Sequence, residues 1–113
     1  MERIVKVAGE KIGLKVSAGT VRAYRDTFGR DLILDMGAVE ADILGSKTRT
    51  LSASSAEIAE NAIYIMAKEF DKSIGSIEEW LEQYSPYFIY GAVVHAIGMW
   101  HDNLKTLNES KKN

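Results

Sequence analysis

Apolar and polar residues alternate over residues 3–16, RIVKVAGEKIGLKV, and this pattern predicts a β-hairpin. Gly9 and Glu10 lie between the two alternating runs, where we expect the turn. An isolated hairpin is only marginally stable in water, so its apolar face should pack on helices. The residues of that face are Val5, Val7, Ile12, Leu14 and Val16.

The next segment, SAGTVRAYRDTFGRDL at residues 17–32, changes to the spacing of three and four that is typical of a helix. Either Ser17 or Thr20 can cap its start, and Gly29 can end it, because glycine readily adopts the left-handed conformation. The apolar face of this helix is Val21, Tyr24 and Phe28.

Three arginines mark the same segment. Arg22 and Arg25 fall off the apolar face, and Arg22 can pair with Asp26 four residues later. We interpret the arginines as a solvated face in preference to a phosphate site. We expect Arg30 to pair with Asp31 and so to fix the chain after the helix.

Residues 36–55 are rich in Gly, Ser and Thr and form the least structured region by composition. A structureless loop of this length is unusual inside a compact domain. We therefore expect one short element at residues 39–44 and mobility at residues 45–55.

Three further helices are predicted from their start signals. Residues 54–57, SSAE, and residues 76–79, SIEE, resemble capping boxes, and Ser85-Pro86 resembles a helix start with proline in the first turn. The first of these helices should bury Ile58, Ala62, Ile63, Ile65, Met66 and Phe70, and the second should carry Trp80, Leu81 and Tyr84.

The last helix should run to about Leu107. Its predicted apolar face is Tyr90, Val93, Ile97, Trp100, Leu104 and Leu107, widened by Ile89, Ala92, Ala96 and Met99. Gly91 and Gly98 interrupt this helix and allow either a close helix contact or a bend.

These elements predict an α+β fold, in which an N-terminal β-hairpin packs on a mostly α-helical single domain of four to five helices. The domain should span residues 1–107, with a polar tail at 108–113. The chain has 113 residues, of which 46% are hydrophobic, which suits one core. The N-terminal residues lack the apolar segment of a signal peptide, and no apolar run approaches the roughly 20 residues of a membrane span, so we expect a soluble intracellular protein.

Candidate chemistry is sparse. The chain has no cysteine, and His95 and His101 are six residues apart, whereas helical metal ligands are usually three or four apart. No glycine-rich phosphate loop and no nucleophile motif is present, so we expect no enzyme, no cofactor and no metal site. The net charge of −2 disfavours nucleic-acid binding, which stays only as a minor alternative.

Aromatic residues crowd the last third of the chain, and a small domain cannot easily bury all of them. Exposed aromatic side chains often anchor protein interfaces. Tyr87 and Phe88 are the aromatics that we expect to be exposed. The candidate partner-binding residues are Tyr87, Phe88, Tyr90, Trp100, Arg22 and Arg25.

The run SAGTVRAYRDTFGRDL, the later ENAIYIMAKEFDKSI and SIEEWLEQ, and the closing aromatic helix together resemble the tail assembly chaperones of long-tailed bacteriophages and prophages of Gram-positive hosts. The resemblance implies a non-catalytic protein of the host cytoplasm that binds the tape measure protein. It would keep this helix-rich chain soluble and help to recruit tail tube subunits. The resemblance leaves homo-oligomerisation open.

Such chaperones often have a longer form made by ribosomal frameshifting, and the resemblance implies that the tail tube protein binds through that form. Consecutive lysines, here Lys111 and Lys112, can be encoded by a slippery run of adenines, although a solvated basic tail explains them equally well. Two other readings stay open. One is a structural tail-completion or head–tail connector protein of the virion, and the other is a small nucleic-acid-binding regulator.

Overall fold

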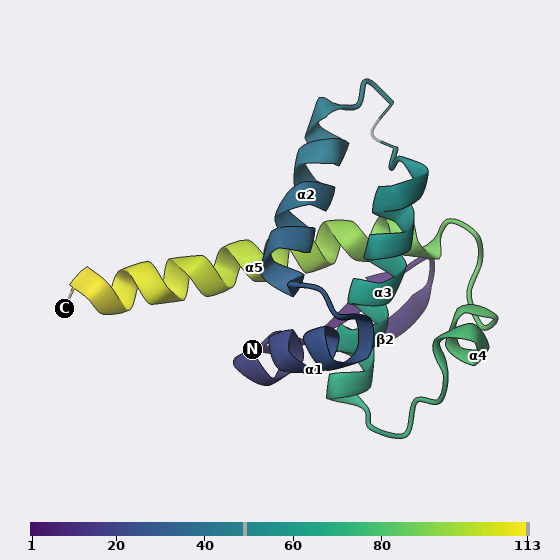
Figure 1. Ribbon diagram of the computed structural model, residues 1–113, viewed down its shortest axis with the longest axis horizontal. Coiled ribbons are helices and arrows are strands. Elements are labelled where there is room, and N and C mark those ends of the chain that lie inside the picture. The colour runs from purple at the N-terminus through teal and green to yellow at the C-terminus, as the bar shows by residue number, and fades with distance from the viewer. Residues whose placement is uncertain (49, 113) are drawn as a thin grey trace.

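The computed structural model describes residues 1–48 and 50–112, with side chains described as far as Lys105. A two-stranded antiparallel hairpin is followed by five helices in the described chain, and together they form one α+β domain (Figure 1). The predicted fold class is therefore confirmed.

The hairpin consists of β1 (Glu2–Val7) and β2 (Glu10–Lys15), paired so that Val7 lies opposite Glu10. Ala8 and Gly9 form the turn, with φ angles of 51° and 83°. Two central residues with positive φ match the twist of the flanking strands, so the turn lies one residue earlier than predicted. The predicted apolar face, Val5, Val7, Ile12, Leu14 and Val16, is buried.

Helix α3 (Ala53–Phe70) is the centre of the fold. It contacts β2, α1 (Ala18–Phe28), α2 (Leu32–Gly45), α4 (Ile77–Leu81) and α5 (Phe88–Lys112). Its residues 62–67 are buried without interruption, so this middle segment is covered on all sides, whereas polar residues such as Glu57 and Lys68 lie towards the two ends of the helix. Of its predicted core residues, Ile58 is only half-buried and the Phe70 ring is exposed over Gly13.

The start of α3 differs from the prediction. Ser52, and not Ser54, caps the helix, and its hydroxyl accepts a hydrogen bond from the Ser55 amide at 3.3 Å. The Ser52 amide donates in turn to Asp42 Oδ2 at 2.8 Å, and this bond lowers the pKa of Asp42. This tie to α2 places the cap two residues before the predicted one.

Helix α1 begins and ends where predicted. Ser17 and Thr20 cap each other in a reciprocal box, and Gly29 ends the helix with a φ of 67°. Tyr24 is buried, whereas Val21 and Phe28 are half-buried.

The short element predicted at residues 39–44 is part of a longer helix, α2, because residues 32–45 form one continuous helix that begins at the Asp31 cap. Its core face is Leu32, Met36 and Val39, at helical spacing, with half-buried Ile43 packed against the core. Gly37 and Gly45 lower the helix propensity of this segment, and packing on α3 outweighs that cost. The predicted mobility of residues 45–55 stays a prediction, and residue 49 lies outside the described residues.

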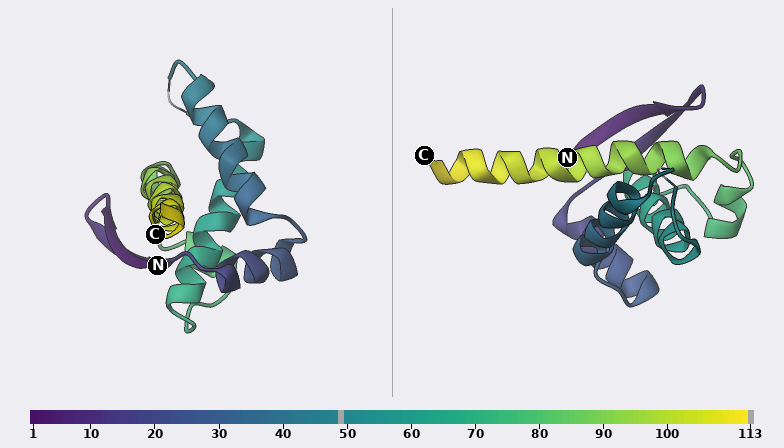
Figure 2. Two further views of the ribbon diagram at one scale, coloured as in Figure 1. Left: turned by 90° about the vertical axis from the view of Figure 1, so that its left-hand side faces the viewer. Right: turned by 90° about the horizontal axis from the view of Figure 1, so that it is seen from above.

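Helix α4 begins at its predicted cap, where Ser76 accepts from the Glu79 amide at 3.2 Å. Helix α5 begins at Phe88, because the Phe88 amide bonds to the Ser85 carbonyl in a turn that contains Pro86. The helix continues to Lys112, past the predicted end at Leu107. Its C-terminal part extends beyond the other elements (Figures 1 and 2).

The buried face of α5 is rotated from the predicted one. Packing on α3 and β1 buries Phe88, Ile89, Ala92, Val93, Ala96 and Met99. Of the six residues predicted for the main apolar face, Val93 is buried, Ile97 and Trp100 are half-buried, and Tyr90 and Leu104 are exposed. The side chain of Leu107 lies outside the described residues.

The two glycines of α5 have different surroundings. A Cβ atom on Gly91 would lie 2.8 Å from Val7 Cγ1, whereas a Cβ on Gly98 would meet nothing within 4 Å. Gly91 therefore permits the close approach of β1 to α5, a contact with a strand and not the helix contact or the bend that was predicted.

We predict opposite effects of alanine at these two positions. Gly91→Ala should lower the free energy of unfolding by roughly 1–3 kcal/mol, because Val7 must move in a packed core. Gly98→Ala should raise it by about 0.5–1 kcal/mol through helix propensity. Urea unfolding followed by circular dichroism measures both, and a stabilising Gly91→Ala would contradict the packing described here.

Candidate functional site

A groove of about 400 Å³ lies between α2 and α5. The two helices cross at a steep angle in Figure 1, and the groove occupies the corner between them, where the extension of α5 begins. Its walls are mostly apolar. Ile33, Met36, Gly37 and Glu40 come from α2, and Ile97, Trp100, His101, Asn103 and Leu104 come from α5.

One polar contact joins the two walls. His101 Nε2 faces both carboxylate oxygens of Glu40, at 2.8 Å and 3.0 Å. Asn103 instead donates its amide to the Met99 carbonyl within α5. The groove thus has an apolar lining with the Glu40–His101 contact at its rim, an arrangement typical of a surface that binds another protein.

A row of side chains on the outer face of α5 leads into this groove. The row consists of Tyr90, Val94, Ile97, His101 and Leu104, at alternating steps of four and three, and we call it the outer row. Tyr90, Val94 and Leu104 are 37%, 62% and 56% exposed. This spacing is that of a coiled-coil seam, so the outer row can pack along another helix.

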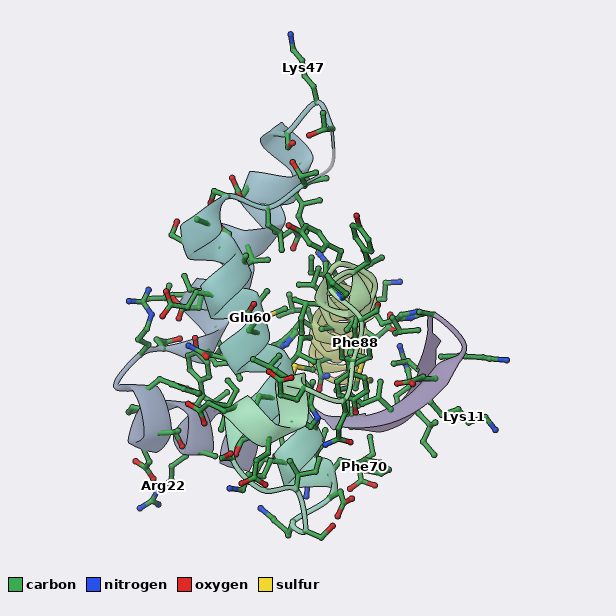
Figure 3. All side chains as sticks on the ribbon, turned by 90° about the vertical axis from the view of Figure 1, so that its right-hand side faces the viewer. Lys11, Arg22, Lys47, Glu60, Phe70 and Phe88 are labelled. Atoms are coloured by element: carbon green, nitrogen blue, oxygen red, sulfur yellow. The ribbon has the colours of Figure 1, made fainter. Side chains whose placement is uncertain are left out.

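The predicted aromatic site residues separate into two groups. Tyr87 is 78% exposed just before α5, Tyr90 belongs to the outer row, and Trp100 lines the groove. Phe88 is only 1% exposed, so its predicted exposure is wrong. Figure 3 shows Phe88 at the start of α5, and its ring stacks on Tyr84 with the centroids 3.9 Å apart.

Phe88 belongs to an aromatic cluster that holds the start of α5. Trp80 lies edge-on to Tyr64, Tyr84 and Phe88, with ring centroids 5.3–6.0 Å apart. Such geometry is favoured by the ring quadrupoles. A partner can therefore reach Tyr87 and Tyr90 but not Phe88.

Arg22 and Arg25 do not join the groove, to which α1 contributes no lining residue. Both are exposed as predicted, and Figure 3 shows Arg22 pointing outward. Arg22 Nε lies 3.8 Å from Asp26 Oδ2, which confirms the predicted pair. An exposed pair of this kind contributes little to stability, so Arg22 and Arg25 form a solvated face, as predicted.

Arg30 has a different partner from the predicted one. It donates from Nε and a terminal nitrogen to the two oxygens of Asp35, at 2.7 Å and 2.8 Å, and not to Asp31. Tyr24 donates its hydroxyl to Asp35 at 2.7 Å. Asp31 instead caps α2 by accepting from the Leu34 amide. The arginine thus fixes the α1–α2 connection through a buried carboxylate.

The three groups alter one another's protonation. The hydrogen bonds from Arg30 lower the pKa of Asp35, although burial opposes this effect. Burial and the Asp35 carboxylate raise the pKa of Tyr24, and the same carboxylate raises the pKa of Arg30. At neutral pH the site holds an ionised Asp35 with two donors, which stabilises the fold.

A second cavity, of about 220 Å³, lies between β2, α3 and α4. Its lining mixes the charged residues Lys11 and Asp71 with Phe70 and Trp80. The α2–α5 groove is larger and more apolar, and the outer row continues from it. We therefore take the groove and the outer row together as the candidate site.

Among the described residues, no group of three or more His, Cys, Asp or Glu side chains is arranged to hold a metal ion. His95 is exposed on α5, and His101 faces Glu40. No helix in the described chain is both long and apolar enough to cross a membrane.

Comparison of the sequence and the structure with known protein families, curated proteins and solved structures gives no match.

We predict that Asp35→Asn lowers stability in a pH-dependent way. The folded-state pKa of Asp35 is depressed, so its stabilisation is present above the unfolded pKa of about 3.9 and is lost as the pH falls through the folded value. The variant should lose roughly 2 kcal/mol at pH 7 and much less near pH 2.

Urea unfolding of wild type and variant at the two pH values measures this difference. Asp26→Asn, which removes an exposed carboxylate from a weak pair, is the matched control and should change little at either pH. An equal deficit for Asp35→Asn at both pH values would show that the ionised carboxylate does not stabilise the fold.

Proposed function

We propose that this protein is a tail assembly chaperone of a long-tailed bacteriophage or prophage. In this role it binds the tape measure protein in the host cytoplasm, keeps it soluble and helps to recruit tail tube subunits. The proposal combines the family resemblance of the sequence with one structural observation. That observation is the outer row of α5, which remains exposed and leads into an apolar groove.

The physical requirement for such a chaperone is a temporary cover for exposed apolar helices. The outer row offers Val94, Ile97 and Leu104 at the spacing with which one helix packs along another. The surface is small and carries a polar rim at Glu40 and His101. Such a surface favours the modest affinity that lets a chaperone leave before the tail is complete.

The proposal contains no catalytic step and no cofactor. It assigns tail tube recruitment to a longer, frameshifted form, and the test of that assignment is a slippery heptamer in the gene over Lys111 and Lys112. A persistent structural role in the tail remains the alternative, and a mature virion distinguishes the two. A chaperone should be absent from purified particles, whereas a tail-completion or connector protein should be retained.

The direct test is co-expression with the tape measure protein of the same phage. Wild type should render the tape measure soluble and co-purify with it. Val94→Glu places a charge in the outer row and should reduce co-purification by roughly tenfold. Leu34→Glu is the control, because Leu34 is 73% exposed on α2 but lies outside both the groove and the outer row.

Both substitutions are on exposed helical positions, so the melting temperatures of the two variants should stay close to that of wild type. Two results together would contradict the chaperone function: the tape measure protein stays insoluble when co-expressed with wild type, and this chain is found in purified virions. They would indicate a structural tail protein instead. An equal loss of co-purification for Val94→Glu and Leu34→Glu would show that the outer row is not the binding surface.

A further inference from the structure

Gly37 has no role in the packing of the described chain. It lies inside α2, where glycine costs about 1 kcal/mol relative to alanine. A Cβ atom added to it would meet nothing within 4 Å, and its φ is not positive. Yet Gly37 lines the α2–α5 groove. A helix-interior glycine that the fold does not need, on the wall of an open groove, points to a close approach from outside.

We propose that the groove binds one amphipathic helix of the client protein, whose backbone approaches α2 at Gly37 and whose basic residues face Glu40. This inference deepens the proposed function, on which it rests for the identity of the client. It adds the binding mode and the chemistry of the bound segment.

Both walls of the groove present side chains at helical spacing. On α2, Ile33, Gly37 and Glu40 are separated by steps of four and three, and the outer row of α5 has the same steps. Ridges of one helix fit into grooves of another at these spacings, and the distance between the axes shrinks where side chains are small. The missing side chain of Gly37 therefore creates the place where a third helix can lie closest.

The acidic side chains of α2 favour a basic helix in the groove. Leu32–Gly45 contains Asp35, Glu40 and Asp42 but no lysine or arginine. Arg30 already neutralises Asp35, which is buried. Glu40 is at the groove, where it contacts His101, whose side chain is 53% exposed and carries a charge only when protonated. An apolar helix flanked by lysine or arginine complements this wall, and one flanked by glutamate is repelled.

The test uses two labelled peptides of about 18 residues, each with leucines at helical spacing and a central alanine. One carries lysines beside the apolar stripe and the other carries glutamates. Fluorescence anisotropy measures their binding to the full chain. The lysine peptide should bind roughly tenfold more tightly than the glutamate peptide, and equal binding of the two would overturn the charge assignment.

The matched variants are Gly37→Ala and Gly98→Ala. Each adds one methyl group to a helix interior that has open space, but Gly98 does not line the groove. Both should raise the melting temperature. Only Gly37→Ala should weaken the binding of the lysine peptide, by roughly tenfold. Unchanged binding to Gly37→Ala would overturn the proposed contact, and the rise in melting temperature excludes misfolding as the cause of any loss.

Two further outcomes separate this inference from its competitors. If wild type sediments as a dimer and Gly37→Ala as a monomer, the occupant is a second copy of this chain and the inference is wrong. Co-expression of both variants with the tape measure protein separates the binding mode from the function. If both variants keep the tape measure protein equally soluble, the chaperone function stands and the groove is not its binding site. If the lysine peptide binds but no form of the chain keeps the tape measure protein soluble, the groove binds a helix and the chaperone function is wrong.

Discussion

The burial of the middle of α3, residues 62–67, on all sides is the constraint on which the rest of this structure depends. Such a segment must be covered by neighbouring elements around its whole circumference, and β2, α1, α2, α4 and α5 all contact this helix. This arrangement uses one face of α2 and one face of α5 for the core. The groove forms where other residues of the two helices, joined by the Glu40–His101 contact, line a common space. The candidate site is therefore a consequence of how α3 is enclosed.

Local chemistry predicted much of the fold. The alternation in residues 3–16, the caps at Ser17 and Ser76 and the left-handed Gly29 each depend on a few neighbouring residues, and each appears in the structure. Only residues 39–44 of helix α2 were predicted as an element, because Gly37 and Gly45 argue against a longer helix, although Asp31 was a recognisable cap. Its core face becomes apparent only when α3 lies against it.

The site was less predictable because it depends on tertiary contacts. Phe88 was expected at the surface, yet the stacked Tyr84 and the edge of Trp80 enclose it. Arg30 was assigned to its neighbour Asp31, but the turn between α1 and α2 brings it to Asp35. The groove has no signature in the sequence, since Gly37 and Leu104 are 67 positions apart and meet through the crossing of two helices. Tyr87 is exposed as predicted, because aromatic excess in a small chain is visible from composition, whereas Tyr90 was placed on the predicted apolar face of the last helix.

The central claim is that the exposed side of α5 and the adjoining wall of α2 form the surface that receives a client helix. Amide hydrogen exchange of the free chain and of its complex with the tape measure protein tests this claim most directly, since it reports every backbone segment at once. The account predicts added protection in Leu32–Gly45 and in residues 97–104, with the hairpin and α1 unchanged. Protection confined to α1 or to the hairpin, with none at the groove, would contradict it.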